Sequence, residues 1–313
     1  MKEPDRWVRD GLDEPLEPEP IWRSRSQQPP PRERYLLHAA LFLVTVASVW
    51  ATGGPLLALG LLPILFSHEM GHYIACRRYG VSATLPYFIP SPWYPIAFPA
   101  VWVPLSFVGT LGAVIRIRSP IPNRKALFDI GLAGPVAGFV VCLPVLVLGL
   151  LEAEIRPTDA DAFGIALGEP LLFQWMSQLV VGEVPAESTM YLGSLGLAAW
   201  FGLFITALNL IPIGQLDGGH VTYAWLGPRA YSISRMGSWI CLALTYFGPN
   251  WLVWSILLSL LGRRHPPTLD DSLPLDRTRV IWAYIGLAIF VVCFVPNPIE
   301  WSWSDFGEAM GWF

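Results

Sequence analysis

The chain has 313 residues, of which 53% are hydrophobic and 14% charged, and its net charge is −4. A soluble domain carries nearer a quarter charged residues, so this composition favours a membrane protein. It argues against a nucleic-acid-binding protein, which would present a basic patch on a soluble fold. The cysteines lie far apart in apolar runs without a CxxC pair, which predicts buried thiols and no disulfide framework or cysteine metal site. They are Cys76, Cys142, Cys241 and Cys293.

Residues 1–34 differ from the rest of the chain because they are rich in proline and in charges of both signs. Such a segment buries too little apolar surface to fold alone, so we predict a disordered tail. It lacks the apolar core of a secretory signal, and its many acids are untypical of an organelle transit peptide. We therefore expect a cytoplasmic tail on a protein of the bacterial inner (cell) membrane.

Seven apolar segments follow, and a membrane span needs about 20 such residues. Segments 35–52 and 55–76 are so close together that they predict a tight helical hairpin. The others are residues 126–151, 192–211, 231–247, 251–261 and 280–295. Because segment 251–261 is short, it either spans the membrane or forms a re-entrant hairpin with the segment before it. We predict an all-α polytopic membrane protein with about six or seven transmembrane helices, a membrane domain at 35–296 and a short external tail at 297–313.

The distribution of Lys and Arg predicts the orientation, because these residues are in excess in cytoplasmic loops. If the N-terminus is cytoplasmic, every Lys and Arg except Arg156 lies on the cytoplasmic side. The predicted external loop at 152–190 carries that one arginine and seven acids. This topology leaves the C-terminus outside.

The second apolar segment contains the sequence His68-Glu69-Met70-Gly71-His72. Positions i and i+4 of a helix share a face, so the two imidazoles can bind one metal ion. Zinc held by two histidines and a carboxylate keeps a position open for water, whose pKa it lowers to about 7. Glu69 can then act as the general base. Ionisable residues inside an apolar span are costly, which favours this function over two interfacial histidines.

Residues 209–220, with the sequence NLIPIGQLDGGH, offer a third ligand. Pro212 and Gly214 break the helix there, and we expect Gly218 and Gly219 to loosen the backbone after Asp217. Broken helices at membrane depth line cavities or binding sites. Asp217 is therefore the acid best placed to reach the metal. The alternative is an interfacial turn carboxylate, because Asp-Gly is a common turn dipeptide.

These two motifs, together with the sequence GPVAG at residues 134–138, resemble the site-2 protease family of intramembrane zinc metalloproteases. The resemblance extends over about residues 56–220. We therefore predict that the catalytic core lies at about residues 55–220. It implies one zinc ion per chain, bound by His68, His72 and Asp217, with Glu69 as the base. It further implies that Asn209 holds the substrate or stabilises the oxyanion.

The first and last residues of the motif at 209–220, Asn209 and His220, each allow more than one role. The side-chain amide of Asn209 suits oxyanion stabilisation, and its alternative is a hydrogen bond between helices. His220 as a fourth protein ligand would close the metal site, so we expect it beside the site or at the interface. His38 and His265 receive no role.

We expect this chain to differ from larger members of that family, with no PDZ domain in its loops and no CBS domains in its tail. Residues 81–119 are too proline-broken for a straight span and end in an alternating stretch, 115–118, that predicts a strand in a membrane-associated hairpin. An exposed strand edge would receive an extended substrate, and the alternative is an interfacial plug. In the external loop, residues 170–181 are spaced like a surface-lying amphipathic helix, either a gate or a simple lid.

The predicted function is hydrolysis of peptide bonds within or near transmembrane segments. The resemblance implies that the substrates are single-pass membrane proteins already cut by another protease. We expect the protein to lie in the lipid bilayer and to bind no nucleic acid. One alternative is a pseudoprotease that binds membrane proteins without cutting them, although the intact Glu69 counts against it. The other is a metal transporter, which would show internal repeats and polar residues in several spans.

Overall fold

The computed structural model describes residues 34–91, 108–158, 166–246, 248, 251–252, 254–256 and 265–299. The predicted tail at 1–34, apart from its last residue, lies outside the described residues, as do the tip of the 81–119 loop and most of the tail at 297–313. Of the short sixth apolar segment, residues 251–252 and 254–256 are helical and the remainder lies outside. The described part of the chain is mostly helical.

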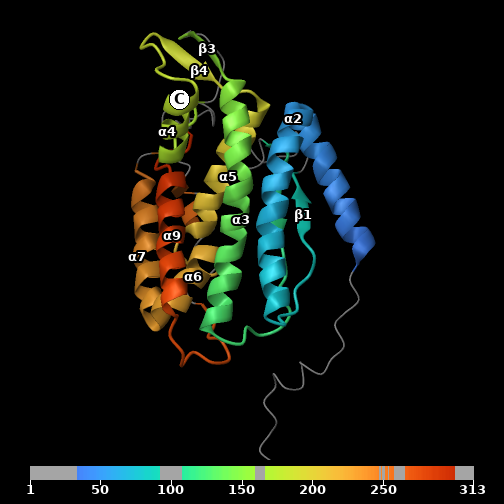
Figure 1. The fold of residues 1–313 in the computed structure, drawn as a ribbon, viewed down its shortest axis with the longest axis vertical. Helices are drawn as coiled ribbons and strands as arrows, with labels where there is room; N and C mark the ends of the chain where they lie inside the picture. Colours follow the sequence, from blue (N-terminus) through green and yellow to red (C-terminus); the bar gives the residue numbers. More distant parts are fainter. Residues whose placement is uncertain are drawn as a thin grey trace, which may run out of the picture. The chain divides into compact units, whose positions relative to one another are not determined.

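Figure 1 shows the helices and strands of the described residues. The helices are α2 (Tyr35–Arg78), α3 (Arg124–Leu151), α4 (Leu171–Val180), α5 (Ser194–Leu210), α6 (Asp217–Leu226), the 3-10 helix η3 (Gly227–Arg229), α7 (Ala230–Leu244) and α9 (Arg277–Cys293). The strands are β1 (Tyr87–Pro90), β2 (Thr110–Val114), β3 (Glu154–Pro157) and β4 (Ser188–Tyr191).

Helix α2 consists of two limbs that meet at a sharp reversal (Figure 1). Gly53 and Gly54 leave the helical conformation there, and Gly54 has a φ of 79°, which favours glycine. Pro55 then begins the second limb, where proline's missing N–H costs nothing. Ser194 of α5 donates to the Gly53 carbonyl at 2.8 Å and fixes the reversal from outside. The structure thus confirms the predicted hairpin of two helices.

Two helices of the described chain are long and apolar enough to cross a membrane, α2 with 44 residues and α3 with 28. Helix α5 is as apolar but has 17 residues. Helices α7 and α9 occupy the predicted fifth and seventh segments with 15 and 17 residues. The count of six or seven spans therefore stays a prediction.

The second limb of α2, helix α3 and helix α5 pack against one another, and small residues at the contacts let the backbones approach closely. A Cβ atom on Gly60 of α2 would lie 2.7 Å from Ala198 of α5, and one on Gly149 of α3 would lie 2.4 Å from the Gly196 backbone. Large side chains such as Trp200 fill the spaces between these contacts and are fully buried. All four cysteines are buried and free, as predicted.

The predicted hairpin loop is a two-stranded antiparallel sheet of β1 and β2, with Tyr87 opposite Val114 and Phe88 opposite Ala113. Phe88 lies between the limbs of α2, with its ring centroid 5.0 Å from that of Phe42 and 6.5 Å from that of Phe66. The hairpin is therefore packed against both limbs.

The strand predicted at residues 115–118 is wrong in its bounds, since β2 ends at Val114. The chain stays extended beyond it, with a single bridge between Ile117 and Ala83. The Arg116 N–H bonds the Thr84 hydroxyl at 3.0 Å in place of a backbone carbonyl. A side-chain acceptor of this kind competes with the ladder and interrupts it.

At the other end of the bundle, β3 pairs with β4 beside α4 (Figure 1). Helix α4 confirms the amphipathic helix predicted at residues 170–181, with Phe173 and Ser177 buried. The ladder of β3 and β4 was not predicted. Its strands have four residues each and lie 30 residues apart in sequence, so they produce too short a pattern to recognise.

Candidate metal centre

The second limb of α2 brings His68 and His72 onto one helical face. Both residues are buried, with 5% and 6% of their surfaces exposed. Their rings meet edge to face at 4.8 Å, and their Nε2 atoms lie 3.1 Å apart. The i, i+4 spacing thus converges both nitrogens on one point.

Asp217 reaches the same point from α6, of which it is the first residue. Helix α5 ends at Leu210, and a turn with Gly214 at a φ of 58° returns the chain toward α2. The Oδ2 atom of Asp217 lies 3.2 Å from the Nε2 atoms of both His68 and His72. The N-terminus of a helix favours a carboxylate at this position.

The expected loosening of the backbone at Gly218 and Gly219 is wrong, because both lie buried in the first turn of α6. A Cβ on Gly218 would lie 2.0 Å from the Leu210 carbonyl oxygen, and one on Gly219 would lie 2.3 Å from that of Gly214. These glycines therefore let α6 pack against the turn that precedes it. The tight packing holds Asp217 beside the histidines.

The three side chains fit a zinc ion. Their ligand atoms form the one cluster of at least three metal-binding groups among the described residues. Two atoms bound to zinc at about 2.0–2.1 Å with a tetrahedral angle lie about 3.3 Å apart. The separations of 3.1 Å and 3.2 Å seen here match that requirement. Two imidazoles and one carboxylate also leave one of four positions for water or substrate.

A backbone carbonyl of α3 orients His72. The Nδ1 atom of His72 donates to the Ile130 carbonyl at 2.7 Å, which leaves the Nε2 lone pair directed at the metal site. Motif reasoning did not predict this contact, because a backbone carbonyl leaves no mark on residue type.

The glycine-rich face of α3 makes room for both histidines. A Cβ on Gly134 would lie 2.1 Å from the His72 Nε2 atom, and one on Gly138 would lie 3.2 Å from the His68 Cβ. Gly131, which the predicted GPVAG motif did not include, approaches the His220 Cβ, with 2.8 Å from an added Cβ. Glycine is therefore needed for space at Gly131 and Gly134, whereas a Cβ on Gly138 would make a tight contact without a clash.

Gly134→Ala is therefore expected to weaken metal binding with the fold retained. The new methyl displaces the movable His72 ring from the site, and overpacking of this kind costs about 1–3 kcal/mol. If that cost falls on metal binding, affinity drops by about 5- to 150-fold. Competition with a chelator measures this affinity. Gly138→Ala is the matched control and should change it little, so equal effects of the two variants would contradict this account.

Glu69 and Asn209 border the three ligand atoms. Glu69 is buried, with 8% of its surface exposed, and its carboxylate faces the Ile115 backbone beside the hairpin. Asn209, near the end of α5, places its amide nitrogen 3.3 Å from the His68 Nε2 atom. The structure thus brings together all five residues proposed from the sequence, namely His68, Glu69, His72, Asn209 and Asp217.

His220 does not join the ligand atoms, and its Nδ1 lies 2.6 Å from the Nε2 atom of His265. The His265 ring stacks on Tyr223, with the centroids 4.7 Å apart. His265, which had no predicted role, therefore partners His220. His38 is not part of the ligand cluster, and its Nδ1 atom lies 3.0 Å from the Pro86 carbonyl oxygen.

Comparison with known proteins identifies relatives. The probable zinc metalloprotease EGY1, chloroplastic, of Arabidopsis thaliana is 30% identical over 266 residues, 82% of this chain and 44% of that protein. The probable zinc metalloprotease EGY2, chloroplastic, of Oryza sativa subsp. indica is 30% identical over 249 residues, 77% of this chain and 42% of that protein. This chain thus spans less than half the length of these relatives. No solved structure matches it.

Residues 56–244 match the sequence profile of peptidase family M50. The matched region includes the second limb of α2, helices α3, α5 and α6, and therefore every residue of the candidate centre. This match confirms the resemblance inferred from the two motifs. The chain belongs to peptidase family M50, the site-2 protease family.

Proposed function

We propose that this protein is a zinc-dependent protease that hydrolyses peptide bonds within or near transmembrane segments of other membrane proteins. One observation carries the proposal: three ligand atoms lie 3.1–3.2 Å apart beside a buried carboxylate, and two of these atoms and the carboxylate belong to a helix apolar enough to cross a membrane. Membership of family M50 and relatives named as zinc metalloproteases support it.

His68, His72 and Asp217 would hold the zinc ion. When bound, zinc supplies a Lewis acid that lowers the pKa of water and polarises the substrate carbonyl. Glu69 accepts the proton that the attacking water loses, and then donates it to the leaving amine. Asn209 donates an amide hydrogen bond to the oxyanion that develops on the substrate. Burial of these side chains strengthens each of these electrostatic interactions.

We propose that water reaches this site from the side of the turn between α5 and α6, residues 211–216. A small pocket with room for about one water molecule borders that turn, and it is lined in part by Tyr231, Ser234 and His265. These polar side chains suit water, which needs two to four hydrogen-bonding partners.

The extended segment at residues 115–118 is proposed to bind the substrate as an added strand. The Thr84 N–H donates to the Arg116 carbonyl at 3.0 Å, and the Arg116 N–H donates to the Thr84 hydroxyl at 3.0 Å. Both backbone groups of Arg116 are therefore directed toward residues 82–84. The backbone groups of Ile115 and Ile117 point the opposite way, because neighbouring residues of a strand alternate in direction. Ile115 faces Glu69 on that side. A substrate paired along this edge would therefore pass the catalytic base.

Ile117→Pro is expected to slow cleavage of every substrate, because proline removes the backbone donor at this edge. The matched control is Ile117→Val, which retains that donor and the apolar side chain. A rate unchanged by proline would contradict pairing at this edge. Purified protein in lipid vesicles, with the cleavage products identified by mass spectrometry, provides the rates.

Cleavage is also expected to require a substrate helix that unwinds easily. An unsatisfied backbone group in lipid costs several kcal/mol, so helix-breaking Gly, Pro or Asn residues in the substrate span lower the cost of extension. Replacing these residues by Leu should slow cleavage without changing insertion. If unbroken Leu-rich spans are cut equally fast, substrates are recognised outside their helices.

We further propose a multi-pass protein with a cytoplasmic N-terminus. Family members are membrane-embedded. The end of α2 and the beginnings of α3 and α9, which carry Arg78, Arg124 and Arg277, lie at one end of the bundle, and β3 with Arg156 lies at the other (Figure 1). This separation supports the positive-inside topology.

A cysteine introduced at residue 313 is expected to be labelled from outside the cell, because this topology leaves the C-terminus there. Labelling only from the cytoplasm would mean that the predicted number of spans is wrong by one.

The proposed substrates are single-pass membrane proteins trimmed beforehand, because a bulky external domain would obstruct entry to a site inside the bilayer. The relatives are named as chloroplastic, whereas the sequence predicts a bacterial inner membrane. That localisation stays a prediction.

A further inference from the structure

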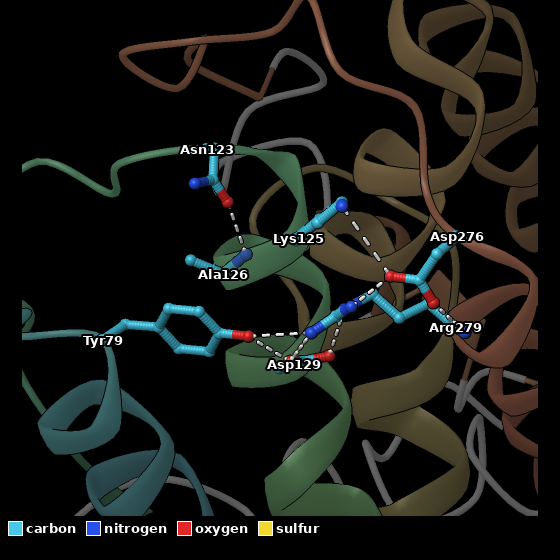
Figure 2. A network of polar contacts seen from close by, with 7 residues as sticks. All are labelled: Tyr79, Asn123, Lys125, Ala126, Asp129, Asp276 and Arg279. Carbon is cyan, nitrogen blue, oxygen red and sulfur yellow. Dashed lines mark hydrogen bonds and ion pairs between the residues drawn. The ribbon is translucent and has the colours of Figure 1, made fainter.

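A polar cluster joins α3, α9 and the residue that follows α2, as Figure 2 shows. We call Tyr79, Asp129 and Arg279 the clamp. The Arg279 Nε donates to the Asp129 Oδ1 at 2.9 Å, and one of its terminal nitrogens donates to Oδ2 at 2.6 Å. The same nitrogen lies 2.9 Å from the Tyr79 hydroxyl, which donates to Asp129. The clamp thus connects α9 to α3 and to the residue that follows α2.

Arg279 is held in position by its own helix. Asp276 caps the start of α9, where its Oδ1 accepts from the Arg279 N–H at 3.1 Å, and its other oxygen pairs with the Arg279 side chain. The side chains of Arg279 and Asp129 are 23% and 31% exposed, so solvent only partly screens their ion pair. The guanidinium therefore presents a fixed pair of donors to Asp129.

The clamp is adjacent to the contact that orients a metal ligand. Asp129 immediately precedes Ile130, whose carbonyl accepts from the Nδ1 atom of His72 at 2.7 Å. Tyr79 follows His72 by seven residues, about two helical turns. Polar contacts therefore link this part of the chain to α3 both at the metal ligand and at the clamp.

The turn of α3 that contains Ile130 is weak as a helix. Pro135 has no N–H, so the carbonyl of Gly131 lacks its usual helical partner. Gly131 and Gly134 add backbone freedom, because glycine is a poor helix former. Helix propensity alone therefore does not fix the Ile130 carbonyl, and an external contact at Asp129 would restrict it.

We propose that Tyr79, Asp129 and Arg279 are positioning residues for the metal centre: the clamp fixes the Ile130 carbonyl, and this carbonyl directs the His72 Nε2 atom at the zinc ion. Helix α9 lies outside residues 56–244, which match the family profile. It thus contributes to the geometry of a site that it does not enter. This inference rests on the proposed role of His72 as a zinc ligand.

The experiment uses the full-length protein in detergent. The variants are Tyr79→Phe, Asp129→Asn and Arg279→Gln, and the matched control is Arg277→Gln, which removes an exposed arginine from the same helix. Zinc release to a chelating dye and the visible spectrum of the cobalt-loaded protein are measured beside thermal unfolding of the metal-free protein. Loss of an outer hydrogen-bonding partner costs about 10–100-fold in metal affinity. Because the clamp acts through Ile130, we expect zinc release about tenfold faster and a shifted cobalt spectrum.

Release and spectra equal to those of the parent protein would overturn the proposal, even if the unfolding temperature falls. Tyr79→Phe decides the result if the charge variants do not fold, since it leaves the ion pair in place. His72→Ala separates the two levels of inference. If it keeps zinc, the ligand assignment fails; if it loses zinc while the clamp variants behave like the parent, only the clamp proposal fails.

Discussion

Replacing His68 and His72 together by alanine is expected to reduce bound zinc from one ion per chain to none. The two imidazoles supply two of the three protein ligands, and a single Asp217 carboxylate in a site built for four-coordinate zinc cannot retain the metal. Their Nε2 atoms lie 3.1 Å apart with no other described metal-binding cluster nearby. Elemental analysis of the purified protein measures the stoichiometry.

His220→Ala is the control for this experiment, because His220 lies near the site but faces His265. It should retain one zinc ion per chain. Zinc that survives the loss of both His68 and His72, or that is lost with His220 alone, would show that the metal is bound elsewhere.

Glu69→Gln is expected to lower the cleavage rate by about 10²–10⁴-fold with zinc retained. Glutamine has almost the shape of glutamate but cannot accept a proton, so the variant separates proton transfer from metal binding. Glu154→Gln, at the opposite end of the bundle in an exposed pair with Arg156, is the matched control and should leave the rate unchanged. A Glu69→Gln protein that cleaves at the parent rate would exclude Glu69 as the base.

The local part of the site could be predicted from the sequence because helical periodicity is local. The spacing of His68 and His72 alone implies convergent nitrogens, and the structure has them 3.1 Å apart. Asp217, 145 residues after His72, could not be positioned by helical spacing. The broken helix before it indicated this acid, and the motif resemblance implied that it is a ligand. The helix that starts at Asp217 was missed because Gly218 and Gly219 suggested a turn, whereas tight packing against carbonyls requires them in a helix.

Contacts made by backbone groups and by distant side chains could not be predicted. The Ile130 carbonyl that orients His72 can belong to any residue type. The contact between Tyr79 and Arg279 joins positions 200 residues apart in sequence. The bounds of β2 depended on the hydroxyl of Thr84, which replaces one backbone acceptor. Tertiary packing determines each of these features.

Proteomics of membrane-bound fragments tests the central claim most directly, because it does not require a known substrate. Cells that carry the Glu69→Gln form are compared with cells that carry the parent protein at equal abundance. Our account predicts that trimmed fragments of single-pass membrane proteins, each with an uncut transmembrane segment, accumulate only in the variant cells. Identical fragment populations in both cells, with zinc bound to both proteins, would contradict intramembrane proteolysis and favour a protein that binds membrane partners without cutting them.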